Sequence, residues 1–280
     1  MKLSRESIAG ILEREKLTNP IVHYISDMAK ASDFAEVIKM LNGRSIMTYG
    51  IEEIHEITAA SNSLVIGLET LDNGKILAME RALRIAKKKR VPVLLDLAGV
   101  NLSLYRRNTA LSFLNRYTID LVKGTDEEIK TIIRAQKRNR CKEKKIDSEY
   151  RDFAMKNKVF LLVESKKYYI TDGYSEFYIE NYSEFIKEKI DIEYILTALL
   201  AIGIGGVRDK IEEMAAILIA VMTFSIVCTL EEKIIKEYYE DNYLKCKEIL
   251  LNGIINIDDE KIYDLGMINY KFTSRRVSIW

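Results

Sequence analysis

Six short runs of apolar residues, many of them β-branched, recur along the first two-thirds of the chain. Most are continuous rather than alternating, as in SLVIG and PVLLDL, which is typical of strands buried on both faces of a parallel sheet. We expect strands at Ile21–Ser26, Ser45–Thr48, Leu64–Gly67, Pro92–Leu97, Asp120–Lys123 and Val159–Val163.

Other stretches place apolar residues three or four positions apart, which predicts amphipathic helices. These stretches are Asp27–Leu41, Gly74–Lys89, Ile192–Ile202 and Lys210–Lys236. A glycine-rich turn is expected at 203–206, and Asp172-Gly173 predicts a hairpin between Lys167 and Ile179. Alternation of strands and helices predicts an α/β fold whose central, mostly parallel sheet is flanked by helices on both faces.

The domain organisation is expected to be simple. The chain has 280 residues, of which 48% are hydrophobic, and it contains no Pro- or Ser-rich linker. We expect a single domain over residues 1–280, with no role assigned to the tail at 258–280. The longest nearly apolar run, Ala215–Leu230, falls short of the roughly 20 residues of a membrane span. It is therefore interpreted as a buried core helix, and no membrane association is expected.

Charge and cysteine content narrow the classes of function. Lys plus Arg is 43 and Asp plus Glu is 42, so the net charge of +1 does not indicate a nucleic-acid partner. The basic run Arg134–Lys145 lacks the interleaved aromatic residues of single-strand binders and is interpreted as a solvated surface segment. Three cysteines without a CxxC pair form no disulfide framework or zinc site, which favours a reducing, cytoplasmic location.

Five motifs, in the same order and at plausible spacing, resemble those of the hydroxyethylthiazole kinase family. Asn19–Asp27 (NPIVHYISD) is similar to NPLVHxITN, and Gly43–Met47 (GRSIM) is similar to GASPAM. Val91–Val100 (VPVLLDLAGV) resembles VPVVLDPVGVGA, Leu121–Ile129 (LVKGTDEEI) resembles IRGNxxEI, and Tyr169–Gly173 (YITDG) resembles YVTDG.

The resemblance covers about residues 17–235 and implies a ribokinase-like fold. It implies transfer of the γ-phosphate of ATP to the primary alcohol of 4-methyl-5-(2-hydroxyethyl)thiazole, a thiamine salvage step that requires Mg²⁺. It also implies a homotrimer whose thiazole site lies between neighbouring subunits. The implied cofactors are therefore ATP and Mg²⁺, and the implied ligand is a small thiazole alcohol or an analogue.

The phosphate-binding loop departs from the family pattern. The family's TGTGC corresponds here to residues 190–194 (IDIEY), anchored on Thr197–Leu199, which matches the family's SAL. Asp191 and Glu193 replace both glycines, and Tyr194 stands at the position of the cysteine. Glycine lets backbone amides close on a phosphate. A carboxylate about 4 Å from a phosphate oxygen instead repels it by roughly 4 kcal/mol at an effective dielectric near 20.

Further changes lie on the nucleotide side of the implied site. Glu164 replaces the threonine of the family's VTG, and Lys123 replaces a phosphate-contacting arginine and loses its bidentate fork. Thr125 replaces the asparagine near the magnesium, whereas Glu128, the implied Mg²⁺ ligand, is retained. Asp96 is also retained, at the carboxyl end of a predicted strand, where ligands of α/β proteins bind.

Three residues are candidates for the substrate side. Met47 matches the family's substrate-contacting methionine. Asp27 replaces the asparagine of ITN, and Glu69 replaces the glycine of NIGTL. The resemblance therefore assigns substrate binding to these three positions, and two of them, Asp27 and Glu69, carry a carboxylate.

Simpler roles are open for several of these residues. Asp191 and Glu193 suit the first turn of a helix without any ligand. Tyr194 suits a packed tyrosine, because a pKa near 10 makes a poor base at neutral pH. Lys123 and Glu128 suit an ordinary ion pair.

Two functions follow from these alternatives. The altered loop favours a non-catalytic relative that acts as a ligand-binding or regulatory protein. The alternative is an active kinase of thiazole or another small alcohol with an unusual phosphate loop. For such a kinase the glycines of residues 203–209 offer another phosphate nest, but they follow the SAL-like helix, where the family has a helix–helix turn.

Assembly can be tested directly. The N-terminal half, which supplies much of the intersubunit site in the family, is the better-preserved half of this chain. We therefore expect a homotrimer, and light scattering at micromolar concentration should report the mass of three chains. A monomer would contradict the prediction and would remove any composite site.

Overall fold

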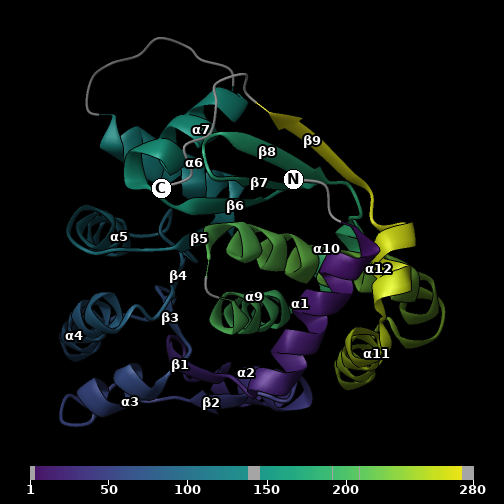
Figure 1. Cartoon of the computed structure of the whole chain (residues 1–280), viewed down its shortest axis with the longest axis horizontal. Helices are drawn as coiled ribbons and strands as arrows, with labels where there is room; N and C mark the ends of the chain where they lie inside the picture. Colours follow the sequence, from purple (N-terminus) through teal and green to yellow (C-terminus); the bar gives the residue numbers. More distant parts are fainter. Residues whose placement is uncertain (1–3, 138–145, 191, 208, 273–280) are drawn as a thin grey trace.

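The computed structural model describes residues 4–137, 146–190, 192–207 and 209–272 (Figure 1). Its strands are β1 (Ile21–Ile25), β2 (Arg44–Ile46), β3 (Ser63–Gly67), β4 (Val93–Asp96), β5 (Leu121–Thr125), β6 (Phe160–Glu164), β7 (Tyr168–Thr171), β8 (Ser175–Ile179) and β9 (Ile268–Phe272). They form one sheet in the order β2-β1-β3-β4-β5-β6-β7-β8-β9. The pairs from β2 to β6 are parallel, and those from β6 to β9 are antiparallel. The predicted mostly parallel sheet is confirmed.

Helices cover both faces of this sheet, as predicted. They are α1 (Arg5–Thr18), α2 (Ala31–Met40), α3 (Ile54–Ala60), α4 (Asn73–Lys89), α5 (Leu104–Arg116), α6 (Asp126–Gln136), α7 (Ile146–Asn157), α8 (Glu184–Lys189), α9 (Glu193–Gly206), α10 (Lys210–Ile234), the π-helical η1 (Ile235–Tyr239), α11 (Tyr243–Asn256) and α12 (Asp259–Leu265). One core cluster joins the sheet to α1, α2, α9 and α10, and the other joins it to α4 through α7. Figure 1 shows α4 and α5 on one side of the sheet and α9 and α10 on the other.

The continuous apolar runs are explained by this double covering. Successive side chains of a strand point to opposite faces. Leu64 and Ile66 of β3 enter the cluster under α4 to α7, whereas Val65 enters the cluster under α9 and α10. Val93 and Leu94 of β4 are divided between the faces in the same way. Both faces require apolar residues, so no polar alternation is left in the sequence.

Several predicted elements begin or end one to four residues from their expected positions, as two examples show. The helix expected from Asp27 begins only at Ala31, because the Asp27 carboxylate accepts a hydrogen bond from the Ala29 amide at 3.0 Å. Such a local turn competes with helix formation. The strand expected at Ser45–Thr48 spans Arg44–Ile46 instead.

The glycine-rich turn expected at 203–206 is wrong, because α9 continues through Gly206. A Cβ at Gly205 would lie 3.3 Å from Asn62 Cβ and Ser63 Oγ, so glycine allows the helix to pack closely against the start of β3. The next helix, α10, is capped by Asp209, whose Oδ1 accepts from the amides of Ile211 and Glu212 at 2.9 Å each. A carboxylate of the chain itself thus occupies the position of an anion, which argues against the alternative phosphate nest.

The tail from residue 258 contributes to the sheet as far as it is described. It forms α12 and then β9, which pairs antiparallel with β8 through Ile179 and Ile268. The basic run at 134–145 is described only to Lys137, at the end of α6, and its residues 138–145 lie outside the described parts.

The long apolar helix is internal to the protein. By length and composition alone, residues Lys210–Tyr239 could cross a membrane. However, 89% of their most apolar 18-residue stretch is buried against the rest of the chain. The prediction of a core helix is therefore confirmed.

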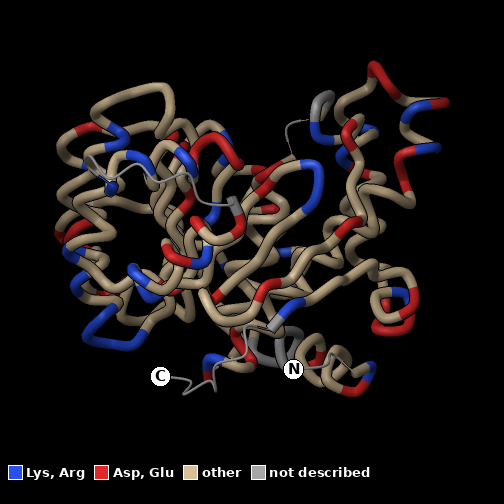
Figure 2. The backbone as a smooth tube through the Cα atoms, turned by 90° about the horizontal axis from the view of Figure 1, so that it is seen from above, with Lys and Arg blue, Asp and Glu red and all other residues tan. Residues whose placement is uncertain are grey.

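Charged positions, both acidic and basic, are interspersed along most of the backbone tube in Figure 2.

Gly10 provides a test of α1, a helix that the sequence pattern did not predict. Gly10 lies within α1, and a Cβ there would meet no atom within 4 Å. We expect Gly10→Ala to raise the free energy of unfolding by roughly 0.5–1 kcal/mol, as in an exposed helix interior. Urea denaturation would measure the change, and a destabilised variant would contradict the helix. The matched control is Gly173→Ala, which should destabilise because Gly173 has φ +92° and its Cβ would lie 2.2 Å from Met155 Cγ.

Candidate functional site

The carboxyl ends of neighbouring strands bring the predicted nucleotide-side residues together. Parallel register places Gly67 of β3 beside Asp96 of β4, and Asp96 beside Lys123 of β5. Thr125, at the end of β5, lies beside Glu164 of β6. The strand register itself therefore places Asp96, Lys123 and Glu164 at one edge of the sheet.

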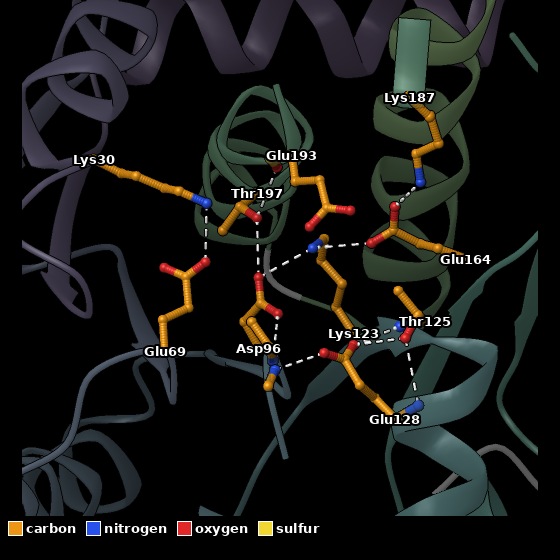
Figure 3. Close-up of polar contacts among 12 residues, drawn as sticks. Lys30, Glu69, Asp96, Lys123, Thr125, Glu128, Glu164, Lys187, Glu193 and Thr197 are labelled. Atoms are coloured by element: carbon orange, nitrogen blue, oxygen red, sulfur yellow. Dashed lines mark hydrogen bonds and ion pairs between the residues drawn. The ribbon is translucent and has the colours of Figure 1, made fainter. Parts of the chain in front are cut away.

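Lys123 is the centre of a buried ion network (Figure 3). Its Nζ lies 3.0 Å from Asp96 Oδ2 and 2.9 Å from Glu164 Oε1, and its side chain is only 2% exposed. Burial by itself would lower the pKa of Lys123, but Asp96 and Glu164 raise that pKa well above its ordinary value. The ammonium is therefore charged at neutral pH, and two of its three hydrogens have carboxylate acceptors.

Glu164 extends the network to a second lysine. Its side chain is 1% exposed, and its other carboxylate oxygen is paired with Lys187 of α8. Burial opposes ionisation, but Lys123 and Lys187 together hold the pKa of Glu164 at about 2. Glu164 is therefore fully ionised at neutral pH, with a cation on each oxygen.

Glu193 is the first residue of α9 and faces the same network. Figure 3 shows its carboxylate pointing toward Lys123. Lys123 favours the charged form of Glu193, but burial and the nearby Glu164 and Asp96 carboxylates together raise the Glu193 pKa. Thr197, one turn later, ties α9 to the strands because its Oγ1 lies 3.3 Å from Asp96 Oδ2. The start of α9, where a helix favours an anion, therefore faces three carboxylates of the chain itself.

Asp191, the other acid that replaces a glycine, lies outside the described residues. Its predicted place in the phosphate loop stays a prediction. The helix α9 begins at Glu193, and the side chain of its N-cap residue, Ile192, makes no capping hydrogen bond.

Glu128 stabilises the start of α6. Its Oε1 accepts from the Gly99 amide at 2.6 Å, and its Oε2 accepts from the Thr125 amide and hydroxyl at 2.8 and 2.9 Å. Both oxygens thus accept hydrogen bonds from the chain itself, and the role of Glu128 as a Mg²⁺ ligand stays a prediction. The considered ion pair with Lys123 is wrong, because Lys123 pairs with Asp96 and Glu164. Within the described ranges, no group of three or more His, Cys, Asp or Glu side chains could hold a metal ion.

The substrate-side acids lie next to the same edge. Glu69, which follows β3, pairs with Lys30 at 3.1 Å. Burial raises the pKa of Glu69, Lys30 opposes this effect, and the charges of Asp96 and Asp27 add to it. Asp27 and Glu69 are thus close enough to influence each other.

Little open space remains between the nucleotide and substrate sides. The cavity there measures about 20 Å³, room for about one water molecule. It is lined by Tyr24, Ser26, Lys30, Val65, Glu69, Asp96, Glu193, Tyr194 and Thr197. The cavity that these described residues line is therefore too small for a substrate.

Two predicted site residues have other surroundings. Met47 does not line this cavity and packs partly buried against the core under α9 and α10. Tyr194 lines the cavity but is only 5% exposed. Burial raises the pKa of Tyr194, and Tyr243 and Asp33 raise it further, so the phenol stays protonated at neutral pH. Its environment suits packing rather than proton abstraction.

Lys30, Lys187 and Thr197 complete the site and were not recognised as site residues in the sequence. The two lysines neutralise Glu69 and Glu164, but neither belongs to a motif. An acid at the buried end of a strand requires a cation. Glu164 therefore signalled that another lysine or arginine was needed, without indicating which one.

The ion network makes a pH-dependent contribution to stability. The pKa of Glu164 is lowered from 4.5 to about 2 on folding, so its stabilisation is complete above about pH 5 and is lost as the pH falls through 2. Breaking a buried pair typically costs about 3–5 kcal/mol. We therefore expect Glu164→Gln to reduce the free energy of unfolding by roughly 3 kcal/mol at neutral pH and by progressively less below about pH 4.

Urea unfolding at several pH values would measure this difference. The control is Glu184→Gln, whose partner Lys166 is 3.7 Å away and whose side chain is 59% exposed. That variant should stay within about 0.5 kcal/mol of the parent. An effect of Glu164→Gln that is independent of pH would contradict the assignment.

Comparison with known proteins identifies the group to which this chain is similar. The model of the family described as "HK: Hydroxyethylthiazole kinase family" matches residues 12–244. The hydroxyethylthiazole kinase of Clostridium perfringens (strain 13 / Type A) is 26% identical over 268 residues, which are 93% of this chain and 99% of that protein. That of Archaeoglobus fulgidus is 32% identical over 185 residues, which are 65% of this chain and 69% of that protein.

Solved structures agree on the fold. The hydroxyethylthiazole kinase protein from Pyrococcus horikoshii OT3 has a TM-score of 0.82 at 22% identity, covering 95% of this chain and 99% of that one. A ribokinase-like superfamily protein from Enterococcus faecalis V583 has a TM-score of 0.58 at 9% identity, covering 90% and 94%. The family model over residues 12–244 and the shared fold confirm the resemblance seen in the motifs: the chain belongs to the hydroxyethylthiazole kinase family and has a ribokinase-like fold.

Proposed function

We propose that this chain is a non-catalytic member of the hydroxyethylthiazole kinase family, which keeps the fold as a ligand-binding or regulatory protein. The observation that carries the proposal is the state of Lys123. Its ammonium is buried and already paired with Asp96 and Glu164. In a phosphate-transfer site, a lysine at this position would have to be free to contact the nucleotide.

Electrostatics supports the proposal. A phosphate approaching the start of α9 meets Asp96, Glu164 and Glu193, and each carboxylate at about 4 Å repels it by roughly 4 kcal/mol at an effective dielectric near 20. Moving Glu164 aside would leave Lys187 without its carboxylate partner. ATP and Mg²⁺ therefore do not fit the described form of the site.

Glu193 favours a second candidate, an active kinase of a small alcohol. Its carboxylate lines the cavity beside Asp96, and its pKa is raised by burial and by the neighbouring Glu164 and Asp96 carboxylates, a shift that makes a carboxylate a stronger base. In that function, Glu193 would take the proton of the attacking hydroxyl in place of the family's usual loop residue. Measurements of Mg-ATP affinity and of turnover distinguish the two candidate functions.

The ligand and the assembly follow from the family. We propose that the ligand is a small thiazole alcohol or an analogue and that the protein acts as a cytoplasmic homotrimer. Met47 directly follows β2, the edge strand of the sheet. An edge strand is accessible to a neighbouring subunit, so a site that includes Met47 would be completed between chains.

Restoring the family residues should reopen the phosphate site. We expect no detectable Mg-ATP binding by the parent at millimolar ATP, and a turnover of thiazole alcohol more than a hundredfold below the roughly 10 per second of ordinary enzymes. The double variant Glu164→Thr/Glu193→Gly removes two of the three carboxylates around Lys123 and leaves its ion pair with Asp96. Its affinity for Mg-ATP should rise by at least about tenfold.

Calorimetry would give the affinities and a coupled assay the turnover. The control is Glu184→Thr, which removes an exposed acid on α8 and should leave ATP binding unchanged. Tight Mg-ATP binding or rapid turnover by the parent would overturn the non-catalytic proposal. Loss of that turnover in Glu193→Gln would then support the second candidate.

A further inference from the structure

A larger cavity lies at the opposite edge of the sheet. It measures about 600 Å³ and is bounded by the end of α4, the starts of β4 and β5, the end of α9 and the start of α10. Asp96 and Lys123 belong to the carboxyl ends of the same two strands, so this cavity is separate from the site described above. Its volume is within the range of small-molecule sites.

Its floor contains a carboxylate with an unused acceptor. Glu213 is 6% exposed, and its Oε2 accepts from Lys210 Nζ at 2.7 Å. Lys210 also donates to Asp120 Oδ1 at 2.7 Å, while Asp120 Oδ2 accepts from the Val93 amide at 2.9 Å. Glu213 Oε1 is buried without a hydrogen-bond partner in the described structure. Buried polar atoms without partners are rare because they are costly.

The rim of the cavity is basic. Lys87 and Lys89 belong to the last turn of α4, and Arg90 caps that helix. With Lys210, four cations border the cavity against the two acids Asp120 and Glu213. A concave surface with this charge balance attracts anions.

Glu213 can share a proton with such an anion. Burial raises the pKa of Glu213 to about 7, Lys210 opposes this effect, and the charge of Asp120 adds to it. Lys87, Lys89 and Arg90, at the end of α4, line the same cavity as Glu213. The second pKa of a phosphate monoester is near 6. Near neutral pH, a phosphate and Glu213 therefore hold about one proton between them, which either one can donate to the other.

We propose that this cavity is a binding site for a phosphate group, held by the α4 rim residues Lys87, Lys89 and Arg90 and by a shared-proton hydrogen bond to Glu213 Oε1. Phosphate suits the site because its monoanion combines anionic oxygens for the rim with a hydroxyl for Glu213. Free phosphate and a small phosphate monoester share this chemistry. The site is independent of the function proposed above.

Equilibrium dialysis with inorganic phosphate, and in parallel with glycerol phosphate, would test the proposal on the full chain. Raising the pH from about 6 to about 8.5 removes the shared proton and sets two anions against each other, so affinity should fall by at least about tenfold. Calorimetry at about pH 8, where most of both groups is deprotonated before binding, should show proton uptake in two buffers of different ionisation enthalpy. Tighter binding of the ester would identify an ester as the occupant, and tighter binding of inorganic phosphate would identify free phosphate.

Matched variants separate this site from other anion sites. Glu213→Gln keeps a hydrogen-bond donor, so it should bind phosphate with an affinity that changes less than about threefold over the same pH range. Lys89→Gln should weaken binding by at least about threefold, whereas Lys88→Gln, the adjacent lysine outside the cavity, should change it less than about twofold. Three results would each overturn the proposal: no binding at about 10 mM phosphate, a pH dependence that survives in Glu213→Gln, or equal losses in the two lysine variants.

Discussion

The burial of the Lys123 ammonium is the constraint on which the candidate site depends. A buried charge is tolerated only when it is paired. Asp96 and Glu164 both satisfy this requirement, and Glu164 in turn is satisfied by Lys187. One buried cation therefore ties three neighbouring strands to α8. The two flanking lysines also explain why the pKa of Glu164 lies far below its usual value.

The same pairing determines what the site can accept. In a kinase, the negative charge opposite a phosphate-contacting lysine is supplied by the nucleotide and leaves with it. Here the negative charge belongs to Glu164, which is covalently part of β6 and cannot leave. Glu193 adds a third carboxylate at the start of α9, where the helix would otherwise attract a phosphate. In the described structure, the charge of Lys123 is thus balanced by carboxylates of the chain itself.

The two edges of the sheet differ in how their charges are satisfied. At the carboxyl edge, Lys123 is paired with Asp96 and Glu164, Glu164 is also paired with Lys187, and the cavity beside them measures about 20 Å³. At the amino edge, Lys210 and Asp120 are paired, but Glu213 retains a free oxygen beside about 600 Å³ of space. The basic end of α4 lies beside that space. The buried Glu164 is therefore paired through both oxygens at one edge, whereas Glu213 is paired through one oxygen at the other.

By itself the sequence determined the α/β fold, because strand and helix periodicities are local properties of the chain, and its motifs identified the family. It also located Asp96, Lys123 and Glu164 at the ends of strands. Only the tertiary structure decided that residues 203–206 continue a helix, because close packing on β3 outweighs the local preference of glycine. It alone decided that Lys187 pairs with Glu164 across 23 residues. The partner of a buried charge depends on how distant segments pack, and that packing is not encoded in any local pattern.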